Sequence, residues 1–203
     1  MSTNERKNKI IQATLQRFAH YGIPKTSMNE IAEDMRISKA NLYYYFPDKE
    51  TLVREVLCFI SHELFAKRKH IIDSYTDSIK DAVFNLIELN GEYLKKYYML
   101  YIAEHADWVK DKNTIQLLEG FHKQEAEVIV TLFNKAAAKG ELEPLDMEHI
   151  GHLYMEIMDG LIIQRMVFDI ISEIPDASKV EVIIESQKQA ALLILNGLSK
   201  RKL

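Results

Sequence analysis

Hydrophobic positions in the first twenty residues recur with the spacing of an α-helix. One face of this segment carries Ile11, Leu15, Phe18 and Ala19. Gly22 follows at the position where a glycine in the left-handed αL conformation commonly ends a helix. The pattern therefore predicts an amphipathic first helix that is closed by Gly22.

Two short helices joined by a tight turn are predicted next. The run Ser27-Met28-Asn29-Glu30 is a capping box, in which the serine hydroxyl caps a backbone N–H and the glutamate reaches back. The second helix directs Ile31, Ala32 and Met35 inward, and residues 35–37 form the connection. Ser38 caps a third helix, which Pro47 stops, and Asp48 caps the helix after it.

The remainder of the chain also predicts helices, separated by Gly140, Pro144 and Pro175. Their expected ranges are about 48–72, 76–97, 98–108, 112–139, 146–172 and 177–199. No alternating strand pattern and no internal repeat interrupts them. We therefore expect an all-α protein of about nine helices, with a three-helix N-terminal unit and a larger C-terminal helical bundle.

The N-terminal unit has the plan of a helix-turn-helix, whose third helix enters the major groove of DNA. That helix exposes Lys39, Ala40, Asn41, Tyr43 and Tyr44 beside a buried Leu42 and Phe46. A small alanine permits close approach, asparagine pairs with adenine or phosphate, and tyrosine hydroxyls bond phosphates. Lys49 adds a charge to a helix N-terminus, which itself favours phosphate.

Composition and charge agree with this division. Apolar residues make up 47% and charged residues 28% of the 203 residues, as in ordinary globular proteins. The net charge is −4, but residues 1–50 hold 8 of the 26 Lys and Arg and only 6 of the 30 Asp and Glu. The first fifty residues are therefore basic and the remainder is acidic, which suits a protein with one DNA-binding end.

Residues 10–57 resemble the DNA-binding domain of the TetR family of transcription regulators. The residues in the family's order and spacing are Ala13, Phe18, Gly22, Ser27, Ile31, Ala32, Ile37, Ser38, Leu42, Tyr43, Phe46, Lys49 and Leu52. The most distinctive stretch is 41–50, Asn-Leu-Tyr-Tyr-Tyr-Phe-Pro-Asp-Lys-Glu. The resemblance implies a DNA-binding domain over 1–50 and an effector-binding and dimerisation domain over 51–203.

The resemblance also implies which residues contact DNA: Ser27, Lys39, Ala40, Asn41, Tyr43, Tyr44 and Lys49. Two positions depart from the family pattern. Arg36 stands in the turn where the family usually has glycine, and there it accepts a small αL penalty and gains a possible phosphate contact. Ala40 replaces a frequent glycine, so the operator sequence stays open.

The two last helices each carry more apolar positions than a single core requires. A helix that is apolar on two faces needs two partners, which favours pairing with a second copy in a four-helix interface, as in the TetR family. The predicted dimer residues are Leu153, Ile157, Leu161, Phe168, Ile183, Ala190 and Ile194. The alternative is that both helices belong to the core of one chain.

The middle helices are rich in aromatic residues. An apolar cavity with a few polar groups is what a small lipophilic effector needs. The candidate ligand residues are Tyr97, Tyr101, His105, Trp108, Phe121 and Met155. Aromatic stripes at helical spacing also occur as plain core, and that alternative stays open.

Other classes of site find little support. His149, His152 and Glu156 share a helix face, but no cysteine or second carboxylate cluster accompanies them, so no metal or cofactor is expected. No phosphate loop, nucleophile elbow or zinc-protease motif indicates an enzyme. Neither a signal peptide nor a membrane span is recognisable, and the single cysteine forms no internal disulfide, so we expect a cytoplasmic protein with no membrane partner.

These patterns predict a homodimeric transcription regulator that binds double-stranded DNA at a palindromic operator. The favoured form is a repressor that leaves its operator when an unidentified small-molecule effector binds the C-terminal domain. One alternative is an architectural or partner-recruiting DNA-binding factor without an effector. Another is a helical enzyme or scaffold with a vestigial helix-turn-helix, which loss of DNA affinity in Tyr43→Ala and Lys49→Ala would eliminate.

Overall fold

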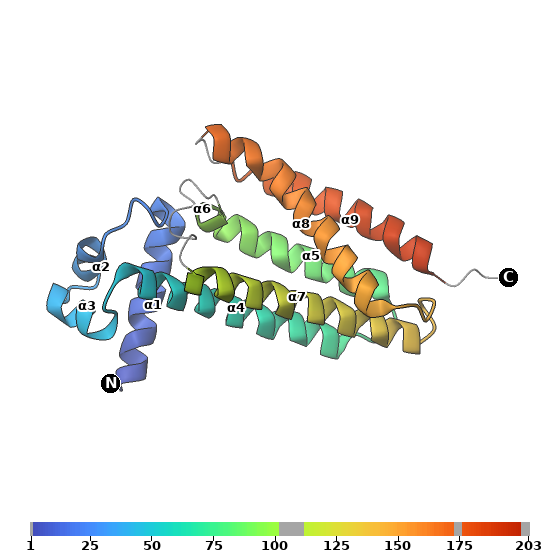
Figure 1. Ribbon diagram of the computed structural model, residues 1–203, viewed down its shortest axis with the longest axis horizontal. Coiled ribbons are helices and arrows are strands. Elements are labelled where there is room, and N and C mark those ends of the chain that lie inside the picture. The colour runs from blue at the N-terminus through green and yellow to red at the C-terminus, as the bar shows by residue number, and fades with distance from the viewer. Residues whose placement is uncertain (1, 102–111, 173–175, 200–203) are drawn as a thin grey trace.

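The computed structural model describes residues 2–101, 112–172 and 176–199, without the side chains of residues 101 and 168–172. Every regular element within these ranges is helical, which confirms the all-α prediction (Figure 1). The helices are α1 (Thr3–Tyr21), α2 (Met28–Asp34), α3 (Lys39–Tyr45), α4 (Lys49–Ser74), α5 (Ile79–Lys96), α6 (Tyr98–Tyr101), α7 (Lys112–Ala138), α8 (Met147–Ser172) and α9 (Lys179–Leu198).

The predicted caps define the N-terminal helices. Ser27 and Glu30 form the capping box of α2, in which the Glu30 N–H donates to Ser27 Oγ at 3.3 Å and the Ser27 N–H donates to Glu30 Oε2 at 2.8 Å. Ser38 accepts from the Asn41 N–H at the start of α3, and Asp48 accepts from the Thr51 N–H at the start of α4. The three predicted caps therefore act through side-chain oxygens on otherwise unpaired N–H groups.

Two turns in this unit have positive φ. Arg36 has a φ of 53° between α2 and α3, in the left-handed region where the family usually has glycine. Gly22 has a φ of 78° and a ψ of 161°, and its N–H donates to the Phe18 carbonyl. The glycine thus ends α1 as expected, but its extended ψ lies outside the αL region, which corrects the predicted αL cap.

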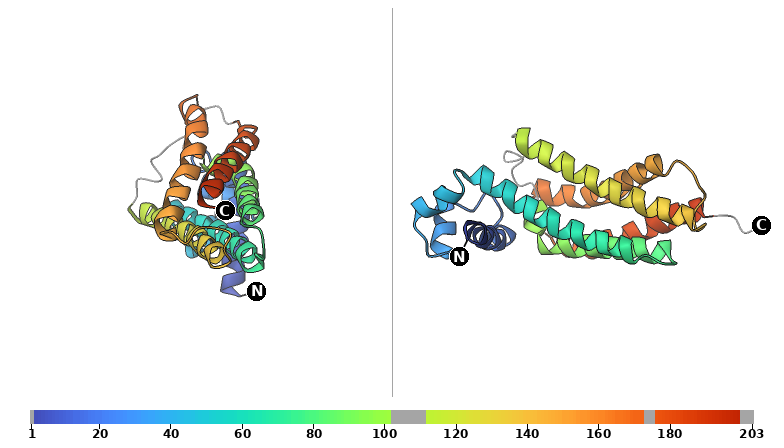
Figure 2. Two further views of the ribbon diagram at one scale, coloured as in Figure 1. Left: turned by 90° about the vertical axis from the view of Figure 1, so that its right-hand side faces the viewer. Right: turned by 90° about the horizontal axis from the view of Figure 1, so that it is seen from below.

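The longer helices form a bundle beside the N-terminal unit. Figures 1 and 2 show α4, α5, α7, α8 and α9 running along the long axis of the molecule, with α1–α3 at one end. The main core lies between these helices and includes Leu132, Phe133 and Leu142, each 0% exposed. Leu132 and Phe133 belong to the apolar stripe of α7, which faces α8, and Leu142 lies in the connection between these two helices.

The N-terminal unit has its own hydrophobic core, but α4 joins it to the bundle. This core contains Phe18, Leu42 and Phe46 and continues along α4 as far as Leu64. It also includes Tyr97 from the end of α5. The predicted domain division after residue 50 therefore crosses a helix that packs into both cores, and the division itself stays a prediction.

The remaining helix boundaries agree closely with the predicted ranges. The exception is the segment predicted over 98–108, of which α6 covers Tyr98–Tyr101 and the rest lies outside the described residues. In the described part of the chain, no helix is long and apolar enough to cross a membrane.

Candidate functional site

The surface of α3 presents polar and aromatic side chains at the end of the molecule. Lys39, Ala40, Tyr43 and Tyr44 are exposed, Tyr44 at 79%, and Asn41 is half-buried. On the opposite side of the helix Leu42 is 0% exposed. The helix is thus anchored by one leucine while its outer face is open for contact with a large partner.

A shallow depression gathers residues from three separate elements beside α3. The start of α2 contributes Ser27, α3 contributes Lys39 and Tyr43, and the start of α4 contributes Lys49. All four are predicted DNA contacts, although they are spread over twenty-odd positions in the sequence. Hydroxyls, ammonium groups and helix N-termini on one concave surface are suited to an anionic backbone.

Two lysines of this depression, Lys39 and Lys49, have different surroundings. The Lys39 ammonium lies 5.7 Å from the centre of the Tyr43 ring, within range of a cation–π contact. Lys49 is half-buried, and this burial lowers the pKa of its ammonium group. Burial weakens the hydration of the Lys49 ammonium group, and the negative charge of a phosphate would compensate for that loss.

Ion pairs fix α2 against α1. Arg17 on α1 contacts Glu30 at 2.8 Å and Asp34 at 2.6 Å, near the two ends of α2. Because Glu30 is also part of the α2 capping box, one arginine orients both the helix and its cap. The remaining predicted contact, Arg36, is exposed at the turn between α2 and α3.

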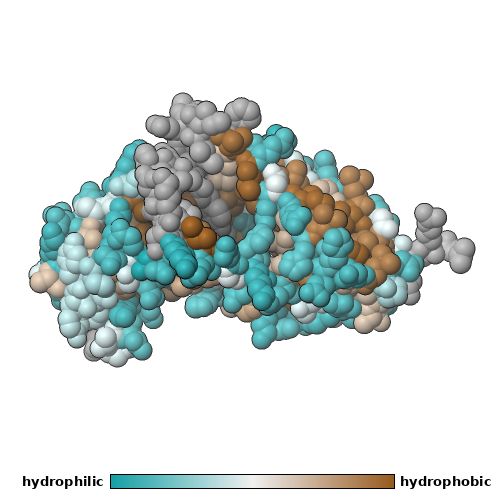
Figure 3. All heavy atoms as spheres, viewed as in Figure 1, coloured by the Kyte–Doolittle hydropathy of each residue, from teal (hydrophilic) through white to brown (hydrophobic). Residues whose placement is uncertain are grey.

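A second exposed surface lies on α8 and α9. Leu153 and Ile157 are exposed at 46% and 37%, and Figure 3 shows hydrophobic side chains gathered over these two helices. The other large apolar residues exposed on them are Ile163, Val182 and Leu193. A patch of exposed apolar side chains on one face is typical of an interaction surface.

The predicted dimer residues divide between this surface and the core. Leu161, Ala190 and Ile194 are half-buried, and Ala190 and Ile194 pack against the main core. Ile183 is 1% exposed and packs within the chain's own core, because it faces Leu94 and Met166 rather than solvent. The side chain of Phe168 lies outside the described residues.

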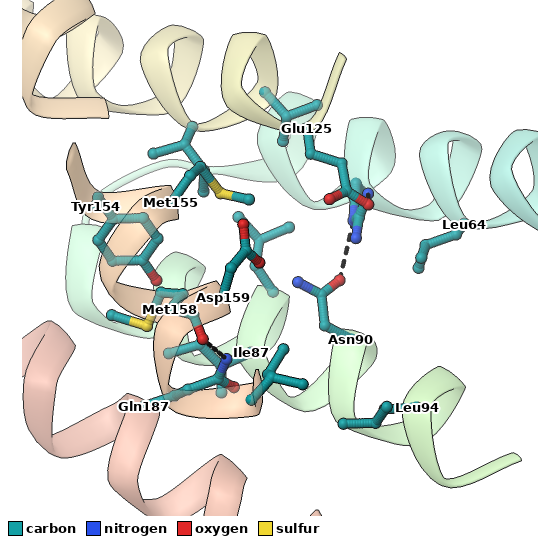
Figure 4. Close-up of a pocket in the computed structure, with 15 residues that line it drawn as sticks. Leu64, Ile87, Asn90, Leu94, Glu125, Tyr154, Met155, Met158, Asp159 and Gln187 are labelled. Atoms are coloured by element: carbon teal, nitrogen blue, oxygen red, sulfur yellow. Dashed lines mark hydrogen bonds and ion pairs between the residues drawn. The ribbon is translucent and has the colours of Figure 1, made fainter. Parts of the chain in front are cut away.

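A cavity of about 140 Å³ lies inside the bundle, between α4, α5, α7, α8 and α9. Most of the fifteen residues that line it are apolar, and Figure 4 shows Met155, Met158 and Tyr154 on one side. Its polar residues are Arg68, Asn90, Glu125, Asp159 and Gln187. An apolar lining with a few polar groups is typical of a small-molecule site.

The polar groups of the cavity differ in their hydrogen bonding. The buried Arg68 guanidinium donates to Glu125 Oε1 at 2.6 Å and to Asn90 Oδ1 at 2.9 Å, and Gln187 donates to the Met158 carbonyl. Asp159 Oδ2, in contrast, is buried without a hydrogen-bond partner in the described part of the chain. Burial raises the pKa of the Asp159 carboxyl to about 6.

Among the predicted ligand residues whose side chains are described, Met155 alone lines this cavity. Tyr97 is buried in the N-terminal core instead, and Phe121 is half-buried on α7 away from the cavity lining. His105, Trp108 and the side chain of Tyr101 lie outside the described residues. The assignment of these residues to a ligand site therefore stays a prediction.

The missed residues carry a signal that helical spacing reveals. Arg68 stands four residues from Leu64 and from Ile72 on α4, so a charge interrupts a buried apolar stripe. Asp159 follows Met155 by four residues on α8 in the same way. A charged residue at an apolar stripe position is therefore a better guide to this cavity than the aromatic residues were.

The three residues considered as metal ligands lie on the surface of α8. His149, His152 and Glu156 are all exposed on α8. Across the described ranges, no group of three or more His, Cys, Asp or Glu side chains is placed to hold a metal ion.

Comparison with known proteins agrees with the geometry of the N-terminal unit. Residues 10–56 match the model for bacterial regulatory proteins of the tetR family. The chain is also 24% identical to the HTH-type transcriptional repressor KstR2 of Mycobacterium tuberculosis over 148 residues, which are 71% of this chain and 74% of that protein.

The chain belongs to the TetR family. It is therefore a DNA-binding transcription regulator and not an enzyme.

Solved structures place the whole chain in this fold. A transcriptional regulator from Cytophaga hutchinsonii superposes with a TM-score of 0.85 at 25% identity, covering 95% of this chain and 98% of that one. A transcriptional regulator from Saccharomonospora viridis, solved in complex with choline, superposes with a TM-score of 0.77 at 16% identity, covering 98% of this chain and all of that one. The similarity in fold therefore extends over the helical body as well as the N-terminal unit of this TetR-family chain.

Proposed function

We propose that this TetR-family regulator is a homodimeric repressor that leaves a palindromic operator when a small molecule enters the cavity of its helical body. The proposal rests on one observation: the continuous helix α4 connects the depression beside the exposed face of α3 with the internal cavity. That helix begins at Lys49 in the DNA-facing depression and lines the cavity with Leu64 and Arg68. A change at the cavity therefore acts on an element that also supports the recognition surface.

The proposed DNA contacts form two groups. Lys39, Ala40, Asn41, Tyr43 and Tyr44 lie on α3, where base edges are within reach of a helix in the major groove. Ser27, Arg36 and Lys49 flank that helix and suit phosphate contacts.

A dimer through α8 and α9 accounts for the exposed apolar side chains there. Leu153, Ile157 and Leu193 would be covered by the same residues of a second copy, in a four-helix interface. Dimerisation also has a purpose in DNA recognition, because two recognition helices must reach successive major grooves about 34–36 Å apart.

Aromatic residues provide a route from the cavity to the DNA-binding core. Tyr93 donates from its hydroxyl to Glu63 on α4 at 2.6 Å, and its ring packs on Tyr97 with centroids 5.8 Å apart. Both tyrosines belong to the core that holds Phe18 and Leu42. A ligand that moves α4 relative to α5 would thus shift contacts inside the DNA-binding unit, and a coupling of about 1–3 kcal/mol is typical of such regulation.

Two relatives support the repressor and ligand assignments. KstR2 is named a transcriptional repressor, and the Saccharomonospora viridis regulator was solved with choline bound. The cavity with its buried polar groups also favours an effector-responsive protein over an architectural factor, whose bundle has no need of such a space.

The test is binding of the full-length protein to its own upstream region over a series of salt concentrations. Lys39→Ala should weaken binding and reduce the slope of log affinity against log salt by about 1, because one phosphate contact is lost. Lys123→Ala, which removes an exposed lysine on α7, is the matched control and should leave both unchanged. Equal effects of the two substitutions would contradict the proposed DNA-binding surface.

A further inference from the structure

The cavity in the bundle carries one negative charge more than its own side chains neutralise. Arg68 is the only lysine or arginine among the described residues that line it, and Glu125 and Asn90 already engage that guanidinium. Asp159 projects toward the middle of the cavity in Figure 4, and its Oδ2 accepts no hydrogen bond from the described residues. A buried carboxylate oxygen without a donor is costly, since burial removes the water that would otherwise serve it.

The groups that face Asp159 do not remove this imbalance. From α4 comes Arg68, which Glu125 holds, and from α7 come Glu125 itself and His122. His122 Nδ1 lies 3.4 Å from Asp159 Oδ2, but the histidine side chain is 55% exposed at the rim and adds positive charge only when protonated. The helices α5 and α9 contribute the uncharged amides of Asn90 and Gln187.

We propose that the effector of this cavity is a small organic amine, whose protonated nitrogen donates to Asp159 while its apolar body contacts Met155 and Met158. This inference rests on the proposed ligand-responsive function and specifies the chemical class of the ligand. A carboxylate ligand is disfavoured because it would face two carboxylates and would have to displace Glu125 from Arg68. An alcohol would donate one hydrogen bond but leave the charge unbalanced.

The size of the cavity limits the amine. A volume of about 140 Å³ is close to that of roughly five water molecules in the liquid. The apolar part of the lining favours a compact hydrocarbon body, as in butylamine, isopentylamine or cyclohexylamine. A long acyl chain or a polycyclic ring system exceeds this volume.

The experiment measures the affinity of the full-length protein for three amines by calorimetry near neutral pH. The probes are butylamine, isopentylamine and cyclohexylamine, each compared with the alcohol and the carboxylate of the same skeleton. At least one amine should bind more tightly than both of its counterparts. Asp159→Asn should lower the affinity of the protein for that amine by ~10-fold or more, which corresponds to about 1.4 kcal/mol of binding free energy.

Glu156→Gln removes an exposed carboxylate from the same helix and is the matched control, with unchanged amine affinity expected. Amine binding should also weaken as the pH falls below about 6, because Asp159 then takes up a proton and loses its charge. The proposal is overturned if no amine binds better than its alcohol, or if Asp159→Asn and Glu156→Gln have the same effect.

Operator affinity measured with each probe separates this inference from the function on which it rests. If a carboxylate or alcohol binds and releases the protein from DNA, the ligand-responsive function stands and the amine assignment fails. If an amine binds through Asp159 but operator affinity does not change, the amine site stands and the release mechanism fails.

Discussion

Single residues in this protein accept local strain or burial where the recognition surface and the cavity are built. Arg36 adopts a positive φ that glycine would occupy without penalty, and Asp159 keeps a carboxylate oxygen buried without a donor. Both are departures from the pattern that stability alone would favour. Substitution of either residue should therefore change stability and binding in a specific way.

Replacing Arg36 with glycine should separate strain from DNA contact. A left-handed conformation costs a residue with a side chain about 1–2 kcal/mol, and glycine loses about 0.5–1 kcal/mol more entropy on folding. Arg36→Gly should thus raise the free energy of unfolding by about 0.5–1 kcal/mol in urea denaturation. Arg36→Ala retains the strain and should leave stability unchanged.

Both Arg36 substitutions should weaken operator binding, because both remove the same guanidinium from the turn. A loss of affinity in only one variant would show that backbone geometry, and not the charge, is what Arg36 contributes.

Asp159 should give stability a distinct dependence on pH. The pKa of this carboxyl is about 6 in the folded protein, above the ordinary value of about 3.9, so the folded state binds the proton more tightly. The contribution of protonated Asp159 to the free energy of unfolding is therefore complete below about pH 4 and is lost as the pH rises through about 6. Asp159→Asn should remove this decline and raise stability at neutral pH by on the order of 1–2 kcal/mol.

Urea denaturation of the wild-type protein and Asp159→Asn between acid and neutral pH measures this effect. Parallel pH profiles for the two proteins would show that Asp159 is stabilised by its surroundings after all.

At the scale of helices, the sequence predicted most of what depends on local chemistry. Ser27, Ser38 and Asp48 fixed three helix starts because a short polar side chain satisfies N–H groups within its own turn. The ψ of Gly22 and the interior position of Ile183 were not predictable in this way. Both depend on contacts between distant segments, and helical periodicity alone cannot tell a core stripe from an interface stripe.

The cavity illustrates the same limit. Its polar residues come from different helices, and only packing decides that Arg68 meets Glu125 while Asp159 Oδ2 accepts no hydrogen bond from the described residues. Tyr97, which was predicted from aromatic content, packs into the N-terminal core. Charged residues within the apolar stripes were the available signal.

Helix packing around Gly151 provides a prediction at this scale. A Cβ at this position on α8 would lie 2.6 Å from Val130 Cγ2 and 3.3 Å from the Val130 backbone nitrogen on α7. Gly151→Ala should therefore lower the free energy of unfolding by about 1–3 kcal/mol through overpacking. Thermal or urea denaturation of the purified variant measures the change.

Gly120→Ala on α7 is the matched control, because a Cβ there meets no atom within 4 Å. This substitution should stabilise the helix by up to about 1 kcal/mol. If both variants changed stability in the same direction, the close approach of α7 and α8 would not be what requires glycine at position 151.

At the scale of the whole molecule, the proposed function joins two copies, one operator and one ligand in a single equilibrium. In the proposed dimer, the exposed apolar side chains of α8 and α9 would set the distance between the two α3 helices, and α4 would connect each α3 to a cavity. Regulation then requires only that the ligand and the operator favour different arrangements of the dimer.

Leu193→Glu should convert the dimer into a folded monomer. Leu193 is 76% exposed on α9, so the charge is harmless in one chain but would be buried between two. Sedimentation analysis measures the mass, and circular dichroism confirms that the helices are retained. Ile115→Glu, at an apolar side chain 40% exposed on α7, should remain dimeric, and a monomer in both or neither variant would contradict an α8–α9 interface.

The most direct test of the account is selection of bound sequences from a random pool of double-stranded DNA by the wild-type protein. We predict an enriched inverted repeat whose half-sites lie about 34–36 Å apart or a multiple of that distance. A protein carrying both Lys39→Ala and Tyr43→Phe should lose affinity for this sequence while remaining folded. Absence of any enriched sequence, or full binding by the double variant, would contradict the claim that α3 reads DNA.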